Sequence, residues 1–176
     1  MTQTTLMMTN ALALATVGMQ IFIVVVVAAL FSQRAPWPRA LLGFLKHHAL
    51  AFGFLVAVGA FAGSIYYSDI VGYEPCSLCW WQRVFIYPQM ILFAIALWRK
   101  DKNIFDYTLA LSIIGGVIAL YHSYIQYGGS PFFECGVDAV SCAKRFVFAF
   151  DYITIPLMSL TTLVTLGLIS VVGRKK

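Results

Sequence analysis

Residues 11–31 read ALALATVGMQIFIVVVVAALF, a run of 21 residues without a charge that is interrupted only by Gln20. At a rise of 1.5 Å per residue, a helix of this length crosses the hydrocarbon core of a bilayer. A secretory signal would begin with basic residues, but none precedes this run. We therefore expect the run to remain in the mature protein as a membrane helix.

Four further apolar runs follow it, at residues 49–67, 80–98, 107–125 and 152–172. The 176 residues are 61% hydrophobic and 11% charged, with a mean hydropathy of +0.84, which excludes a water-soluble globular fold. Five membrane helices and their connections account for nearly the whole chain. The sequence therefore predicts an all-α membrane protein without a separate soluble domain.

The charges alternate between the two sides of these five spans. One side collects nine basic and two acidic residues, in the connections after the first and third spans and at the C-terminus. The other side has three basic and five acidic residues. Cytoplasmic loops are enriched in Lys and Arg, so we expect the N-terminus outside and the C-terminus in the cytoplasm. This clustering indicates membrane orientation, and we expect no nucleic-acid partner.

Small residues in the second span indicate close helix packing. Gly59 and Gly63 form a GxxxG pattern, which lets helix backbones approach each other in lipid. We expect both glycines to face a neighbouring helix in a bundle.

All four cysteines fall on the predicted outer side, as Cys76 and Cys79 before the third span and Cys135 and Cys142 in the longest outer loop. Disulfides form and persist in that compartment. Two pairs there indicate redox chemistry, and the alternatives are two structural disulfides or a zinc site of four sulfurs.

The first pair lies in the stretch PCSLCWWQR, residues 75–83. Pro75 suits the start of a helix, so we expect the third span to begin near Cys76. Backbone N–H groups of a first helical turn stabilise a thiolate. Arg83 follows Cys79 by four residues and lies on the same face. Its guanidinium either extends to the membrane interface or holds an acceptor such as a quinone oxygen.

This stretch and its surroundings resemble the disulfide-bond-formation protein B family (DsbB, with its Gram-positive relatives BdbC). The resemblance covers residues 46–172: a CxxC at the top of a span with Gln-Arg after it, two more spans with a second cysteine pair in the outer loop between them, and a last span. It implies a membrane enzyme that reoxidises a thioredoxin-like, DsbA-like dithiol protein and passes the electrons to ubiquinone or menaquinone. It also implies a location in the bacterial cytoplasmic membrane.

The resemblance also implies roles for individual residues. Cys76 and Cys79 match the pair that exchanges electrons with quinone, with Cys79 adjacent to the quinone, and Arg83 matches the quinone-proximal arginine. His122, at the outer end of the fourth span, resembles a histidine near the quinone. The alternative for His122 is an interfacial histidine among tyrosines. His47 and His48 lie on the other side and are expected to be loop residues.

Cys135 and Cys142 match the pair that meets the soluble partner, with Cys135 attacked first. Only six residues separate them, as on the BdbC side of the family, where better-known members carry a longer insert. The first span also lies outside the usual four-span core. We therefore expect a four-helix transmembrane bundle at residues 49–176 and one additional N-terminal transmembrane helix with a basic connector at residues 1–48.

Two other functions use similar parts. A membrane thiol reductase, or a relative of vitamin K epoxide reductase, would run the electrons in the other direction. In that reductase group the loop pair precedes the CxxC, whereas here it follows. A non-enzymatic membrane protein with structural disulfides is the remaining alternative.

Overall fold

The computed structural model describes residues 3–32, 36–131 and 141–174. Within these ranges the chain forms five α-helices, as expected from the five apolar runs. They are α1 (Gln3–Phe31), α2 (Pro36–Ile65), α3 (Ser77–Arg99), α4 (Ile104–Gln126) and α5 (Ile155–Arg174), and a short π-helix, Tyr66–Ile70, extends α2. The described residues contain no β-strand beyond an isolated bridge between Ala149 and Ile153.

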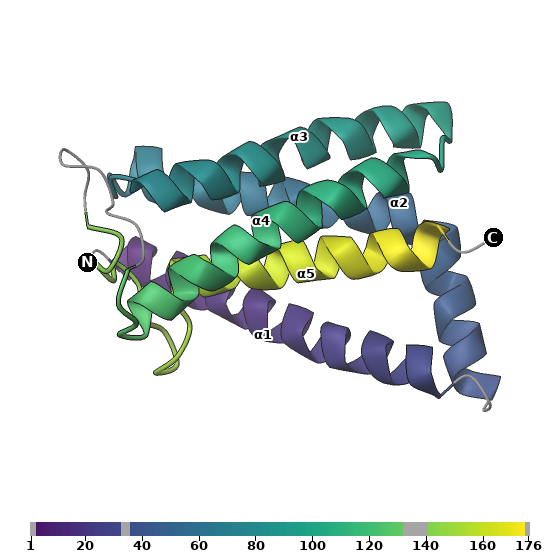
Figure 1. The fold of residues 1–176 in the computed structure, drawn as a ribbon, viewed down its shortest axis with the longest axis horizontal. Coiled ribbons are helices and arrows are strands. Elements are labelled where there is room, and N and C mark those ends of the chain that lie inside the picture. Colours follow the sequence, from purple (N-terminus) through teal and green to yellow (C-terminus); the bar gives the residue numbers. More distant parts are fainter. Residues whose placement is uncertain (1–2, 33–35, 132–140, 175–176) are drawn as a thin grey trace.

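Four of the five helices, α1, α2, α4 and α5, are long and apolar enough to cross a membrane. The helix α3 is less apolar because Gln82, Arg83 and Gln89 interrupt it. Gln82 and Gln89 are nevertheless buried, and the Ser112 hydroxyl of α4 donates to Gln89 Oε1 at 3.2 Å. The polar residues of α3 thus point into the bundle, and α3 runs alongside the other helices (Figure 1).

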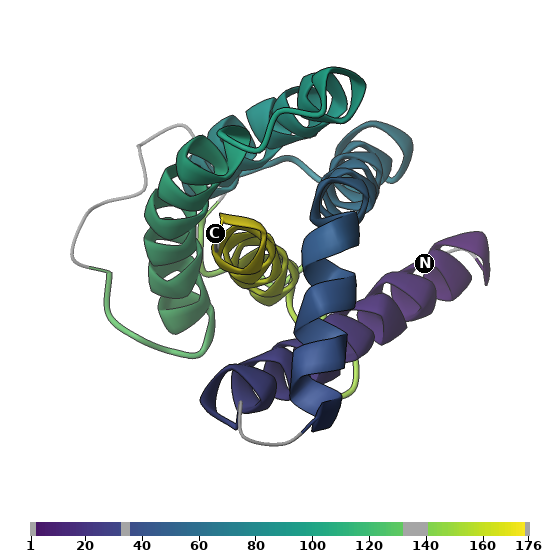
Figure 2. The same cartoon turned by 90° about the vertical axis from the view of Figure 1, so that its right-hand side faces the viewer.

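The helix α5 occupies the middle of the bundle. Viewed along the bundle, α2, α3 and α4 surround α5, and α1 crosses on the outside (Figure 2). Half of the most apolar stretch of α5 is buried, against 17% of that of α1. The chain therefore forms a four-helix unit to which α1 is added as a peripheral helix.

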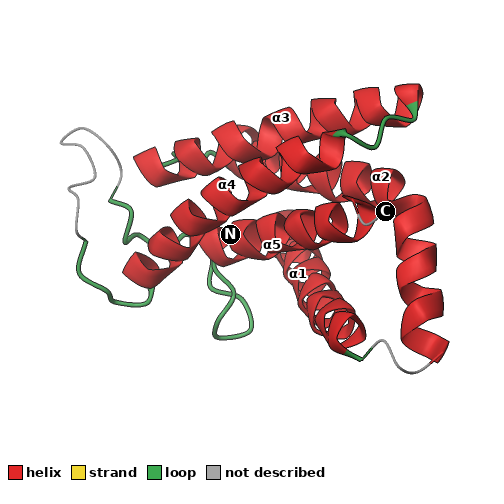
Figure 3. Ribbon diagram, turned by 45° about the vertical axis from the view of Figure 1, so that its right-hand side comes forward, coloured by secondary structure: helices red, strands yellow, loops and turns green. Residues whose placement is uncertain are grey.

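The start of α3 and the connection from α4 to α5 lie at the same end of the bundle (Figures 1 and 3), and the N-terminus lies at this end as well (Figure 1). We call this the cysteine end, because Cys76 and Cys142 lie there. The C-terminus lies at the opposite end (Figure 1). Successive connections between the helices thus lie at alternating ends of the bundle, as the charge pattern predicts.

Two helices extend further than the apolar runs indicate. The helix α1 begins at Gln3 and α2 at Pro36, so the predicted loop positions of His47 and His48 are wrong: both residues belong to α2. Proline is well suited to a first helical turn. Hydropathy marks the part of a helix that lies in lipid and does not report where its backbone hydrogen bonds end.

The glycines of α2 differ in their surroundings. A Cβ atom at Gly53 would lie 2.5 Å from the fully buried ring of Phe93, so α2 and α3 are in close contact there. A Cβ atom at Gly63 would lie 3.3 Å from Leu12 of α1, which confirms the predicted packing role of Gly63. At Gly59 a Cβ atom would meet nothing within 4 Å, so Gly59 is not in close contact with a neighbouring helix.

Candidate redox site

The cysteine pair Cys76 and Cys79 lies at the start of α3, as the sequence predicts. Cys76 is the N-cap residue, with an extended backbone, and its carbonyl accepts a hydrogen bond from the Trp80 N–H at 3.1 Å. The two sulfur atoms are 3.2 Å apart, and both cysteines are free thiols. One turn of helix therefore holds the two sulfurs close enough to form a disulfide with a small movement.

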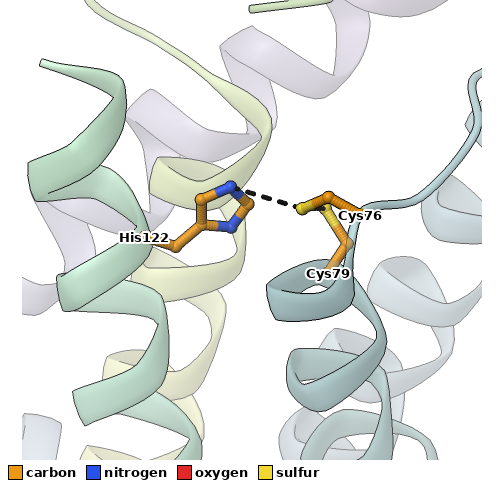
Figure 4. A group of neighbouring side chains, drawn as sticks. All are labelled: Cys76, Cys79 and His122. Carbon is orange, nitrogen blue, oxygen red and sulfur yellow. Dashed lines mark hydrogen bonds between the residues drawn. The ribbon is translucent and has the colours of Figure 1, made fainter. Parts of the chain in front are cut away.

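His122, from the last turns of α4, lies next to this pair (Figure 4). Its Nε2 atom is 3.6 Å from the Cys76 sulfur and 3.1 Å from the carbonyl oxygen of Cys142. Only 1% of the His122 surface is exposed. His122 is thus a buried residue of the bundle, and the structure brings it together with Cys76 and the Cys142 carbonyl.

Gln82 orients His122 from the opposite side of the ring. The Gln82 side-chain nitrogen is 2.8 Å from His122 Nδ1, and Gln82 is 3% exposed. When Gln82 donates to Nδ1, the imidazole proton resides on Nε2 and points toward Cys76 and Cys142. No role for Gln82 was predicted from the sequence, although Gln82 belongs to the Gln-Arg pair that follows the CxxC. The sequence signal that could have pointed to Gln82 is a polar residue inside a membrane helix, one turn after Cys79.

The surroundings of Cys76 favour its thiolate. Hydrogen bonds from Cys79 and then from His122 lower the pKa of Cys76 below its ordinary value, against the opposing effect of burial. Cys76 also precedes the first turn of α3, where backbone N–H groups stabilise negative charge. Cys76 is therefore prepared to act as a leaving group or a nucleophile in thiol–disulfide exchange.

Replacing His122 with glutamine is expected to shift the alkylation of Cys76 to higher pH. A lowered pKa keeps Cys76 ionised until the pH falls through that pKa, so wild-type alkylation persists into acid, and loss of the imidazole raises the pKa. The measurement is the rate of iodoacetamide labelling of the reduced protein against pH, resolved by mass spectrometry. The control is His47→Gln, on an exposed part of α2. Superimposable profiles for His122→Gln and wild type would contradict the role of His122.

Arg83 lies one turn below Cys79 and is partly buried. It donates from Nη2 to the Ser64 carbonyl at 3.5 Å, and its guanidinium carbon lies 5.0 Å from the centre of the Trp80 ring. Among the described residues the only ion pair joins Arg174 and Asp106, so no described carboxylate neutralises Arg83. Its charge thus stays available to a group placed beside the thiols.

A cavity of about 300 Å³ adjoins the two thiols. All five helices contribute to its wall, which includes Cys79, Arg83, His122, Ile86, Leu55 and Met19. The charged side chains and the imidazole of the wall lie near the thiols, whereas the residues further along α2 are apolar or small. The cavity thus has a reactive end and an apolar end.

The second cysteine pair is described only in part. Cys142 is buried and disulfide-bonded, whereas Cys135 lies outside the described residues. The chain after Cys142 is held against the end of α4, because Gln126 donates to the Lys144 carbonyl at 3.1 Å and Arg145 donates to the Gln126 carbonyl at 2.6 Å. These contacts keep Cys142 beside the first pair.

The donor atoms of Cys76, Cys79 and His122 lie within 4.8 Å of one another, a spacing that would also suit a metal ion. The disulfide at Cys142 argues against the zinc site of four sulfurs, since a sulfur in a disulfide is not a thiolate ligand. A dithiol next to a buried imidazole and a second, oxidised cysteine instead suits thiol–disulfide exchange.

Several known proteins are similar to this chain in sequence. Residues 46–172 match the family model described as "Disulfide bond formation protein DsbB". The SPbeta prophage-derived disulfide bond formation protein B of Bacillus subtilis is 43% identical over 116 residues, which cover 66% of this chain and 78% of that protein. The probable disulfide formation protein C of Bacillus cereus is 35% identical over 127 residues, 71% and 91% of the two chains. A probable disulfide formation protein of Chlamydia caviae is 40% identical over 117 residues, 66% and 84% of the two chains. No solved structure matches the chain.

Proposed function

The chain belongs to the DsbB family of disulfide bond formation proteins and is a membrane protein-disulfide oxidoreductase, and from this premise we propose that quinone is its electron acceptor. In this proposal the protein reoxidises a thioredoxin-like, DsbA-like dithiol protein outside the cytoplasm. The electrons pass through the two cysteine pairs to ubiquinone or menaquinone in the bacterial cytoplasmic membrane. The core at residues 49–176 carries this activity.

The observation that carries the proposal is the cavity beside Cys79. A quinone has a flat ring with two carbonyl oxygens and an apolar tail. The guanidinium of Arg83 supplies donors for a ring oxygen, and apolar side chains such as Leu55 and Ile86 suit the remainder. The residues present thus fit a lipid quinone. A bound quinone would accept two electrons and two protons to become a quinol.

The proposed relay begins at the loop pair. A thiolate of the partner attacks the disulfide formed by Cys135 and Cys142, at Cys135, and the partner's second thiolate resolves the mixed disulfide. The partner is then oxidised and the loop pair is a dithiol. One loop thiolate next attacks the Cys76–Cys79 disulfide and forms a mixed disulfide with one of these cysteines. The second loop thiolate then attacks the loop sulfur of that mixed disulfide and releases the first pair as a dithiol. The loop disulfide reforms, and Cys76 and Cys79 hold two electrons and two protons.

His122 and Gln82 support the exchange between the pairs. The Nε2 proton of His122 faces the Cys76 sulfur at 3.6 Å and stabilises its negative charge when Cys76 leaves or attacks. The same nitrogen donates to the Cys142 carbonyl, so the imidazole also holds the loop near the first pair. Gln82 keeps the proton on the nitrogen that faces both groups.

The test is to mix the purified protein with a reduced thioredoxin-like partner and a quinone, and to follow the absorbance of the quinone. We expect quinone to be consumed in equal amount to the partner disulfide formed, and only when all three components are present. A protein that instead consumed quinol and reduced the partner's disulfide would be the reductase alternative. Absence of quinone consumption, with cysteines that keep their redox state, would favour structural disulfides.

A further inference from the structure

The N-terminal helix α1 lies outside the residues that match the family model, and yet it lines the cavity beside the thiols. We infer that α1 forms the wall that holds the apolar tail of a lipid quinone. This inference rests on the proposed quinone function and adds to it a binding role for a helix that the family core lacks.

The cavity-lining residues of α1 form one face of the helix. Leu12, Ala15, Thr16 and Met19 line the cavity, and their spacing of three, four and seven residues puts them on a single stripe. Across the cavity lies a stripe of α2, made of Leu55, Val56, Gly59, Ala60 and Gly63. The walls on these two sides are therefore apolar apart from Ser64 of α2, whose hydroxyl accepts a hydrogen bond from the Tyr87 hydroxyl at 3.0 Å, and the Thr16 hydroxyl. The Thr16 hydroxyl donates to the Leu12 carbonyl of its own helix at 2.8 Å, so it does not need a hydrogen-bond acceptor on a ligand.

The distance between α1 and α2 changes along these stripes. At Gly63 a Cβ atom would lie 3.3 Å from Leu12, so the two helices are in contact there. One turn further along α2, a Cβ atom at Gly59 would meet nothing within 4 Å. The small side chain of Ala15 lines the same cavity as Gly59. Room for a chain of methylene and methyl groups thus exists between α1 and α2.

Polar contacts hold α1 in this position on either side of its lining stretch. Tyr67 of the α2 extension donates to the Thr9 hydroxyl at 3.4 Å. Gln20 donates to Thr161 of α5 at 3.5 Å and accepts from the Tyr152 hydroxyl at 2.9 Å. Gln20, the interruption of the first apolar run, is therefore used to attach α1 to the central helix. A helix attached in this way can serve as a constant wall.

The contact between Arg83 and α2 shows how the α1 wall lies relative to the reactive groups. Arg83 contacts the carbonyl of Ser64, the residue next to Gly63, so α1 meets α2 at the level of Arg83. From Ser64 to Leu55 the helix α2 runs about 14 Å away from the cysteine end. A ring placed beside Cys79 and Arg83 would thus direct its tail between α1 and α2.

Replacing Ala15 with phenylalanine tests this inference, because the larger side chain would fill the space for the tail. We expect the KM for a quinone with a ten-carbon tail to rise about tenfold, which corresponds to about 1.4 kcal/mol. The KM for the same ring without a tail should remain as in the wild type. The matched control is Ala28→Phe, an exposed alanine of the same helix that does not line the cavity. It should change neither value.

A second measurement does not depend on activity. A quinone with a diazirine at the end of its tail is irradiated with the wild-type protein, and the labelled peptide is identified by mass spectrometry. Label within residues 12–19 supports the inference. Label confined to α3, α4 or α5, or equal KM changes for both quinones in Ala15→Phe, overturns it and leaves the proposed function intact. A wild-type protein that reduces neither quinone overturns the proposed function itself.

Discussion

Replacing Cys79 with serine is expected to lower quinone reduction to the rate of the mixture without enzyme. Cys79 is the cysteine of the first pair that lies within α3, and it lines the cavity together with Arg83. A hydroxyl cannot form the disulfide that this pair must cycle through, so electrons from the loop pair have no route onward. The measurement is the fall in quinone absorbance with a reduced partner in excess.

The same variant should still oxidise partner once. The disulfide at Cys142 does not involve Cys79, so we expect about one equivalent of partner to be oxidised per protein before the reaction stops. The control is Ser77→Ala, which alters one of the two residues between the cysteines without removing a sulfur and should turn over normally. Continued quinone consumption by Cys79→Ser would remove the proposed mechanism.

Replacing Arg83 with methionine is expected to raise the KM for quinone about 10- to 100-fold. The change removes the charge and its donors but keeps a long side chain. A hydrogen bond from a charged group contributes about 1.5 to 3 kcal/mol, and this free energy corresponds to a change in affinity of about 10- to 100-fold. Oxidation of the first equivalent of partner, which precedes contact with quinone, should keep its wild-type rate.

The matched control for this variant is Arg99→Met, at the opposite end of the same helix. It removes an equal charge from the last turn of α3, far from the cavity, and should leave the KM for quinone unchanged. An unchanged KM in Arg83→Met would instead assign Arg83 to the membrane interface, the alternative that the sequence left open.

The number of helices and the place of the first cysteine pair could be predicted from local patterns. In a chain this hydrophobic, an apolar run of about 20 residues is expected to form a membrane helix. In lipid the backbone N–H and C=O groups must be paired within the segment, and a helix pairs them. Pro75 before Cys76 marked the start of α3, and Cys76 is its N-cap. These features depend on neighbours in the sequence, so the sequence is sufficient for them.

The contacts that make up the site depend on helix packing and could not be predicted in this way. Gln82 meets His122 across 40 residues, and His122 meets the Cys142 carbonyl across 20. The resemblance to a family implied a role for His122 but none for Gln82, and hydropathy does not tell which face of a membrane helix points inward. The helix ends were missed for a related reason, since α2 continues through the basic residues before its apolar run.

The first helix illustrates the same division. Its apolar run predicted a membrane span and left its purpose open, because lipid-facing and cavity-facing side chains are equally apolar. Only the packed bundle places Leu12 against Gly63, leaves space at Gly59 and makes Ala15 part of the cavity wall. Local composition thus decided that α1 is a membrane helix. The way it packs against α2 and α5 decided that it lines the cavity, since that depends on side-chain shapes brought together from distant parts of the chain.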